Sequence, residues 1–168
     1  MNRTAEQTCL FGTEYTSKAH PRIALRGALD GLHAQGILCA VIARREGHAA
    51  LSLQAEQIAQ AALCLLSAEY SGHPVQLPAQ MDLEQAHTDS HAPKQAFGVD
   101  HFYVTTSMGE TMAHLNLLRT RIRDCERLAV HVFGQSRLDI VQALNRLSSL
   151  AYCLMCQLRA EQEADGCR

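Results

Sequence analysis

The segment HLNLLRTRIRDCER, residues 114–127, carries four arginines within nine positions of a helical apolar pattern. On a helical wheel Arg119, Arg123 and Arg127 are four residues apart and form one stripe. Guanidinium groups bind phosphate oxygens in bidentate geometry, and three adjacent guanidiniums repel one another. The stripe predicts either a site for a polyanion or a solvated helix face with acidic partners nearby.

The remaining residues of this segment divide between the core and local ion pairs. Asp124 and Glu126 are the acidic partners that a solvated face would use, and Arg121 lies off the stripe as a solvated residue. The apolar residues form a second stripe, which predicts the side that packs in the core: Leu115, Leu118, Ile122, Cys125, Ala129 and Val132.

A second polar group interrupts the apolar segment QALNRLSSLAY, residues 142–152. Asn145, Ser148, Ser149 and Tyr152 place amide and hydroxyl groups on one side of this helix. Half-buried polar groups need hydrogen-bond partners. The two segments together predict a helical bundle with an anion-binding groove.

The elements that must position these residues are long helices. The periodicity predicts an all-α fold, a bundle of four or five helices, with helices over 21–45, 50–70, 110–133 and 140–163. Pro21 suits a first helical turn, and Asp139 with Gln142 has the spacing of a capping box at the start of the last helix.

The first helix contains Gly27, Gly31 and Gly36, which predict either a close approach of another helix or ligand, or local slack. The apolar residues of this helix predict its packing side: Ile23, Leu29, Leu32, Ile37 and Val41.

Residues 71–108 contain Gly, Pro and His without periodicity and predict a long irregular connection within one domain covering 1–168. Residues 100–107, DHFYVTTS, have the composition of a short extended piece. His87 and His91 are expected to be surface histidines, although their spacing would let them share a helical turn.

The composition restricts the class of protein. Lys and Arg number 15 against 17 Asp and Glu, so no basic field favours nucleic acid. The apolar runs are shorter than the roughly 20 residues that span a bilayer, and no signal segment starts the chain. We expect a soluble cytoplasmic protein that binds neither nucleic acid nor membrane.

Seven cysteines favour reduced thiols in the cytosol: Cys9, Cys39, Cys64, Cys125, Cys153, Cys156 and Cys167. Cys153 and Cys156 form a C-x-x-C within an apolar helical pattern, with no second pair of ligands at metal spacing. They predict a buried structural role, and no metal site is predicted.

Three blocks of the sequence resemble the ATP:cob(I)alamin adenosyltransferases of propanediol and ethanolamine utilisation. The blocks are SKAHPRIALRGALDGL at 17–32, HLNLLRTRIRDCER at 114–127 and QALNRLSSLAY at 142–152. They are similar to the family's SK-hPRI with G-x-x-D, LHxART-x-x-RRAER and yLNRLSDxLF. The likeness is strongest to the ethanolamine branch.

The resemblance implies a bundle of about five helices with ATP and corrinoid sites at subunit interfaces. It implies transfer of the 5′-deoxyadenosyl group of ATP to the cobalt of a reduced corrinoid, with Mg²⁺, giving adenosylcobalamin and triphosphate. It also implies a homo-oligomer, a trimer in preference to a dimer. A bacterial microcompartment, or an enzyme dependent on adenosylcobalamin, would be its partner.

Site residues are carried over from the matching motif positions. Asp30 and Arg119 match an ion pair across the subunit interface, for which a pair of Asp30 with Arg26 within one helix is the alternative. Either Phe102 or Tyr103 would close the lower face of the corrin, or serve as a core anchor. The nucleotide-binding positions are Lys18, Arg123, Glu126, Arg127 and Asn145.

The sequence also departs from the family's pattern. The Gly-rich phosphate loop is replaced by LFGTEYT at 10–16, where Thr13, Thr16 and backbone N–H groups are the available substitutes. Asp124 stands where the family has arginine, and Ser149 where it has aspartate. These departures leave open a non-catalytic corrinoid-binding or delivery protein, or a structural module of an assembly.

Overall fold

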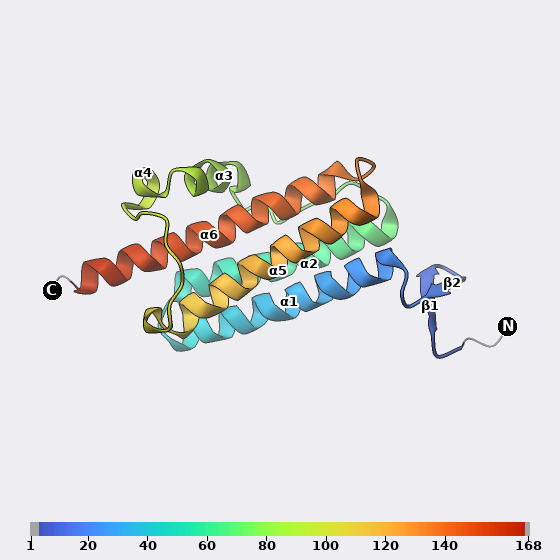
Figure 1. Cartoon of the computed structure of the whole chain (residues 1–168), viewed down its shortest axis with the longest axis horizontal. Coiled ribbons are helices and arrows are strands. Elements are labelled where there is room, and N and C mark those ends of the chain that lie inside the picture. The colour runs from blue at the N-terminus through green and yellow to red at the C-terminus, as the bar shows by residue number, and fades with distance from the viewer. Residues whose placement is uncertain (1–3, 167–168) are drawn as a thin grey trace.

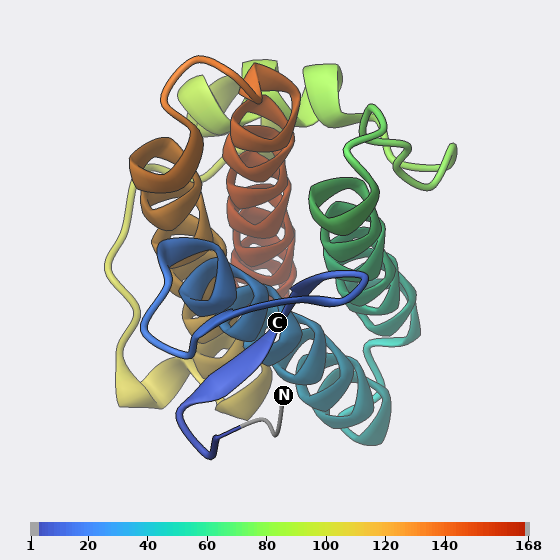
Figure 2. The same cartoon turned by 90° about the vertical axis from the view of Figure 1, so that its right-hand side faces the viewer.

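Four long helices form the body of the molecule in a computed structural model that describes residues 4–166. They are α1 (Pro21–Arg45), α2 (Ala49–Ser71), α5 (Glu110–Phe133) and α6 (Leu138–Gly166). Helix α1 packs against α2 and α5, and α5 packs against α6. The end view in Figure 2 shows these helices around a common centre. The predicted all-α helical bundle is confirmed.

The core is lined by one apolar stripe from each long helix. The stripe predicted on α5 is correct, since Leu115, Leu118, Ile122, Cys125 and Ala129 are buried and Val132 packs against them. Helix α2 is long and apolar enough to cross a membrane by length and composition alone. Its inner side, with Ala55, Ile58, Ala62 and Leu65, is instead buried in this core.

The predicted apolar side of α1 is partly wrong. Ile37 and Val41 are 43% and 59% exposed, while Leu29 and Leu32 are buried as expected. The reason lies at Gly36, where an added Cβ would stand 2.8 Å from the Ala59 Cβ of α2. Because α1 meets α2 through small residues here, Ile37 and Val41 lie on its exposed side.

A β-hairpin precedes α1 and was not foreseen from the sequence. Strands β1 (Gln7–Phe11) and β2 (Glu14–Ser17) pair antiparallel across the turn at Gly12, whose φ is +50°. The segment 10–16, which stands in place of a phosphate loop, is thus mainly strand.

The hairpin is attached to the bundle by a buried ion-pair cluster. The fully buried Glu69 of α2 pairs with Arg22 and Arg26 of α1. Arg26 Nη1 also donates to the carbonyl oxygen of Leu10 (2.8 Å), and the guanidiniums of Arg22 and Arg26 lie over the Phe11 ring at 4.4 and 5.1 Å. The pairing of Arg26 with Glu69 replaces the within-helix pair with Asp30 considered above.

The connection at 71–108 is not irregular throughout, contrary to the prediction. It contains α3 (Leu83–His91), α4 (Pro93–Phe97) and a 3₁₀ turn, η1 (Thr106–Met108). Asp82 caps α3 by accepting from Gln85 N–H (3.0 Å), and α3 lies along α6 (Figures 1 and 2). Residues 100–105 form no strand in the described chain.

Helix α6 begins at Leu138, so the capping box predicted at Asp139 is wrong. Asp139 lies within the first turn, where its carboxylate accepts from Val75 N–H (3.1 Å) and pairs with Arg137 (2.9 Å). The hydrogen bond from Arg137 lowers the pKa of Asp139. The carboxylate fastens the start of the connection to α6 instead of capping the helix.

Candidate functional site

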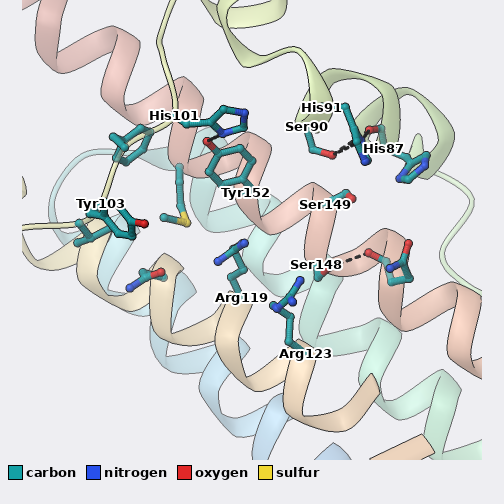
Figure 3. Close-up of a pocket in the computed structure, with 15 residues that line it drawn as sticks. His87, Ser90, His91, His101, Tyr103, Arg119, Arg123, Ser148, Ser149 and Tyr152 are labelled. Carbon is teal, nitrogen blue, oxygen red and sulfur yellow. Dashed lines mark hydrogen bonds between the residues drawn. The ribbon is translucent and has the colours of Figure 1, made fainter. Parts of the chain in front are cut away.

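A cavity of about 600 Å³ lies between α3, α5, α6 and the loop that precedes α5 (Figure 3). The loop is defined as residues 98–109. The lining residues of this α5–α6 cavity are His87, Ser90 and His91 of α3; His101, Phe102, Tyr103 and Val104 of the loop; Asn116, Arg119 and Arg123 of α5; and Asn145, Ser148, Ser149, Tyr152 and Met155 of α6.

The cavity has an excess of positive charge. Arg119 and Arg123 point into it side by side, and no Asp or Glu is among the described residues that line it. Neither guanidinium forms an ion pair within residues 4–166. Burial, followed by repulsion from Arg123, lowers the pKa of Arg119. An anion entering the cavity would therefore relieve an existing repulsion.

Polar groups on α6 continue this surface. Asn145 Nδ2 donates to Glu126 Oε1 of α5 (3.0 Å), so two predicted nucleotide residues are brought together. Arg146 Nη1 donates to Asn145 Oδ1 (3.2 Å), and its Nε pairs with Glu84 of α3 (2.9 Å). These contacts connect three helices and fix the orientation of the Asn145 amide.

Arg127 lies outside the α5–α6 cavity. It pairs with Asp124, is exposed, and lines a smaller cleft of about 260 Å³ with Arg123, Glu126 and Val130. Asp124, which stands where the family has arginine, thus forms an ion pair with one arginine of the stripe, Arg127. Arg127 has the acidic neighbour expected of a solvated helix face, and its role in nucleotide binding stays a prediction, whereas Arg119 and Arg123 line the α5–α6 cavity.

Tyr152 organises the aromatic end of the cavity. Its hydroxyl is hydrogen-bonded to His101 Nδ1 (2.7 Å), and its ring stacks with those of His101 and Phe102 at centroid distances of 5.8 and 6.3 Å. The Arg119 guanidinium lies 5.3 Å from the ring centroid, and burial raises the pKa of Tyr152 to about 12. Tyr103 is 94% exposed, so Phe102 is the more enclosed of the two predicted corrin residues.

Two predicted site residues lie elsewhere. Asp30 is exposed on α1, and within the described chain it pairs with neither Arg26 nor Arg119. Lys18 is exposed immediately after the hairpin, where its N–H donates to the Glu6 carbonyl oxygen (2.8 Å). Neither residue lines the α5–α6 cavity of the described chain.

That α3 lines the cavity was not predicted from the sequence. His87 and His91 were expected on a loop surface, but they share a helical turn, with His91 Nδ1 2.8 Å from the His87 carbonyl oxygen. Their spacing of four was the available signal. It was outweighed by the prolines and glycines on either side.

Cys153 and Cys156 are buried in α6, as predicted. Cys153 Sγ donates to the Ala86 carbonyl oxygen (3.2 Å), which holds α3 against α6. Within residues 4–166 no group of three or more His, Cys, Asp or Glu side chains is placed to hold a metal ion. Cys167 lies outside the described residues.

The model of one protein family, cobalamin adenosyltransferase, matches residues 4–158. The ethanolamine-utilisation corrinoid adenosyltransferase EutT of Escherichia coli is 32% identical over 155 residues, which cover 88% of this chain and 57% of that protein. EutT of Salmonella typhimurium is 44% identical over 77 residues, 43% of this chain and 29% of that protein.

The corrinoid adenosyltransferase PduO of Salmonella typhimurium is 32% identical over 158 residues, covering 89% of this chain and 46% of that protein. The chain therefore spans about half the length of the curated relatives that it matches over most of its own length. No solved structure matches it.

Proposed function

The chain belongs to the cobalamin adenosyltransferase family, and on this premise we propose that it transfers the 5′-deoxyadenosyl group of ATP to a reduced corrinoid. The products are adenosylcobalamin and triphosphate. The observation that carries the proposal is the pair of cavity arginines beside an aromatic wall, which have no carboxylate partner among residues 4–166. One end suits an anion and the other a flat apolar ring.

The reaction requires charge stabilisation and positioning from the protein. Cobalt(I) of the substrate supplies the electron pair that forms the cobalt–carbon bond at C5′, and the C5′–O bond breaks with its electrons leaving on triphosphate. No protein nucleophile is needed. We assign Arg123 to the leaving triphosphate, because a preorganised cation acts where negative charge develops.

Asn145 and Glu126 would hold the nucleotide next to Arg123. Their mutual hydrogen bond of 3.0 Å fixes both groups before the ligand arrives. Mg²⁺ would enter on the phosphate oxygens, since the cavity lining includes no carboxylate among the described residues. Glu126, in the adjoining cleft, is the carboxylate available to its water shell.

The corrin would lie against the loop aromatics. Phe102 is supported from behind by the Tyr152 ring, at a centroid distance of 6.3 Å, and would cover the lower face of the corrin. Excluding a lower axial ligand makes cobalt(II) easier to reduce, so an apolar cover at this face assists the chemistry. Tyr103, at 94% exposure, is free to contact the corrin edge.

A homo-oligomer would complete the site. The outer face of α1 carries exposed Ile37, Leu38 and Val41, with Asp30 on the same exposed side. Asp30 would pair with Arg119 of a second copy, and Lys18 would reach the phosphates of a neighbouring site. We favour a trimer, in the cytoplasm or within a bacterial microcompartment, that supplies an enzyme dependent on adenosylcobalamin.

The proposal is tested by mixing purified protein with ATP, Mg²⁺ and chemically reduced cobalamin. We expect the visible spectrum to change to that of adenosylcobalamin, with release of triphosphate. Corrinoid binding without product would instead favour a delivery protein. Failure to bind either substrate would overturn both functions.

A further inference from the structure

The cavity has a third wall to which the proposed reaction gives no task. It is formed by His87, Ser90 and His91 of α3, here called the α3 edge. In Figure 3 this edge lies at the opposite end of the cavity from His101 and Tyr103. The His87 and His91 rings are 4.6 Å apart between centroids and meet edge to face at 72°. Both rings can therefore reach one small group.

The hydrogen bonds of His91 define which of its ring nitrogens carries the proton. Nδ1 lies 2.8 Å from the His87 carbonyl oxygen, and a carbonyl oxygen can only accept. Nδ1 is therefore the donor, and in the neutral imidazole Nε2 is left as an acceptor. Ser90 Oγ also donates to this carbonyl (2.8 Å) and lies 3.3 Å from His91 Nδ1, so its hydroxyl proton is already used.

His87 has the opposite arrangement of donor and acceptor on its ring. Its Nδ1 is buried and has no hydrogen-bond partner within residues 4–166. A buried N–H without an acceptor is rarer and more costly than a buried lone pair without a donor. We therefore assign the proton of His87 to Nε2, the ring nitrogen left to the cavity, as a donor.

The α3 edge is held in place by contacts on its far side. Glu84 pairs with Arg146 of α6 (2.9 Å), and the Ala86 carbonyl oxygen accepts from Cys153 Sγ (3.2 Å). These contacts fix the first turn of α3 against the helix that carries Asn145 and Tyr152. The donor and the acceptor are thus preorganised relative to the rest of the cavity.

We propose that the α3 edge recognises a neutral group in which a hydrogen-bond acceptor stands next to an amino donor. The inference rests on the proposed function, whose substrates both offer this chemistry. The corrin ring has peripheral carboxamides, and adenine presents N1 beside its 6-amino group. Carboxylates and phosphates lack the donor and would meet the lone pair of His91.

The test uses His91→Phe and His87→Phe, which keep an aromatic ring and remove the nitrogens. The matched control is His131→Phe, at an exposed position of α5 outside the cavity. Each protein is assayed with ATP or inosine triphosphate, and with cobalamin or a monocarboxylic acid derivative of cobalamin. Inosine has an oxygen in place of the 6-amino group.

We expect wild type and His131→Phe to prefer the substrate that carries the amino donor, either ATP over inosine triphosphate or cobalamin over its acid derivative. The KM should differ about tenfold, the effect of one lost hydrogen-bonded group. Both α3 variants should lose that preference. Loss of the ATP preference would assign the edge to adenine, and loss of the cobalamin preference would assign it to a corrin carboxamide. Unaltered preferences, or an equal loss with every substrate, would overturn the proposal.

A wild-type protein that forms no adenosylcobalamin would refute the proposed function and leave the α3 edge testable. Calorimetric binding of ATP, inosine triphosphate and the two corrinoids needs no turnover. The same preference, lost in the two α3 variants, is expected in the dissociation constants. Its absence from wild type would overturn the assignment of the edge.

Discussion

Arg119 and Arg123 are one helical turn apart on α5, yet their surroundings differ. Arg119 is half-buried and lies over the Tyr152 ring, whereas Arg123 is exposed at the junction of the two cavities. Arg119 is held by packing and serves the aromatic end. Arg123 has little packing to lose, so its charge is available to a ligand.

Arg123→Ala is expected to raise the KM for ATP by about tenfold to a hundredfold, because a charge-assisted contact contributes about 1.5–3 kcal/mol. Helicity by circular dichroism should remain that of wild type, since this side chain is exposed. Arg121→Ala removes another exposed arginine, which lines neither the α5–α6 cavity nor the adjoining cleft, and serves as the control. A loss of folding in Arg123→Ala, or equal kinetic effects in both variants, would contradict this role.

The buried cysteines predict a pH dependence. Burial raises the pKa of the Cys39 thiol from 9.0 to about 11 and that of Cys125 to about 12. Between pH 9 and these values the unfolded chain releases protons that the folded chain retains, so the free energy of unfolding falls as pH rises. Urea midpoints measured from pH 8 to pH 10.5 should decrease in that direction.

The same shift controls thiol reactivity, because the thiolate is the nucleophile. Iodoacetamide at pH 8, followed by peptide mass spectrometry, should label the half-buried Cys9 and Cys64 before Cys39 and Cys125. Simultaneous labelling of all four would show that the core opens on the time scale of the reaction.

At the scale of the elements, the contact of α1 with α2 depends on Gly36. A Cβ at this position would stand 2.8 Å from the Ala59 Cβ, so the helices would have to separate. Gly36→Ala is expected to lower the free energy of unfolding by about 1–3 kcal/mol, the usual effect of overpacking. Urea denaturation gives the value.

Gly27→Ala is the matched control on the same helix. Within the described chain nothing lies within 4 Å of a Cβ at Gly27. Alanine should therefore raise stability by about 0.5–1 kcal/mol through helix propensity alone. Equal effects of the two substitutions would mean that the close approach at Gly36 does not limit packing.

The long helices could be predicted from sequence because their apolar stripes run for many turns. On α5 the large residues Leu115, Leu118 and Ile122 all point inward, so periodicity and burial agree. On α1 the inward side includes Gly36 and Ala43, and hydrophobicity alone selected Ile37 and Val41 instead. Which side of α1 packs through small residues depends on the partner helix α2, and the sequence of α1 alone does not show this.

At the site, the polar groups on α5 and α6 favoured a groove between two helices, and Arg119, Arg123 and Asn145 line one cavity there. The roles that the resemblance implies for these residues stay predictions. The α3 edge was not predictable, because its nine-residue helix is capped by Asp82 and docked on α6 by tertiary contacts. A helix this short has no long apolar stripe from which it could be predicted.

At the scale of the whole molecule, the outer face of α1 exposes large apolar side chains that no contact within the described chain covers. Leu38 and Val41 are 46% and 59% exposed on a helix whose other side is in the core. Asp30, on the same exposed side, has no ion pair within residues 4–166. An apolar face beside an unpaired charge is what a second copy would cover, with Arg119 as the complementary charge.

If the proposed homo-oligomer forms through this face, Val41→Glu is expected to dissociate it, because a charge at the centre of an apolar interface is desolvated without a partner. Light scattering after gel filtration measures the mass, and circular dichroism should show unchanged helicity. Leu53→Glu is the control, since Leu53 on α2 is exposed to a similar degree, 58% against 59% for Val41.

If Asp30 completes the site of a second copy, activity must fall together with the mass. Val41→Glu should reduce adenosylcobalamin formation roughly tenfold or more, as expected when an interface contact of about 1.4 kcal/mol or larger is lost from the site. Raising the protein concentration should restore part of the activity by mass action. A variant that becomes monomeric with full activity would place the whole reaction within one chain, and the Asp30–Arg119 pair would then have no catalytic role.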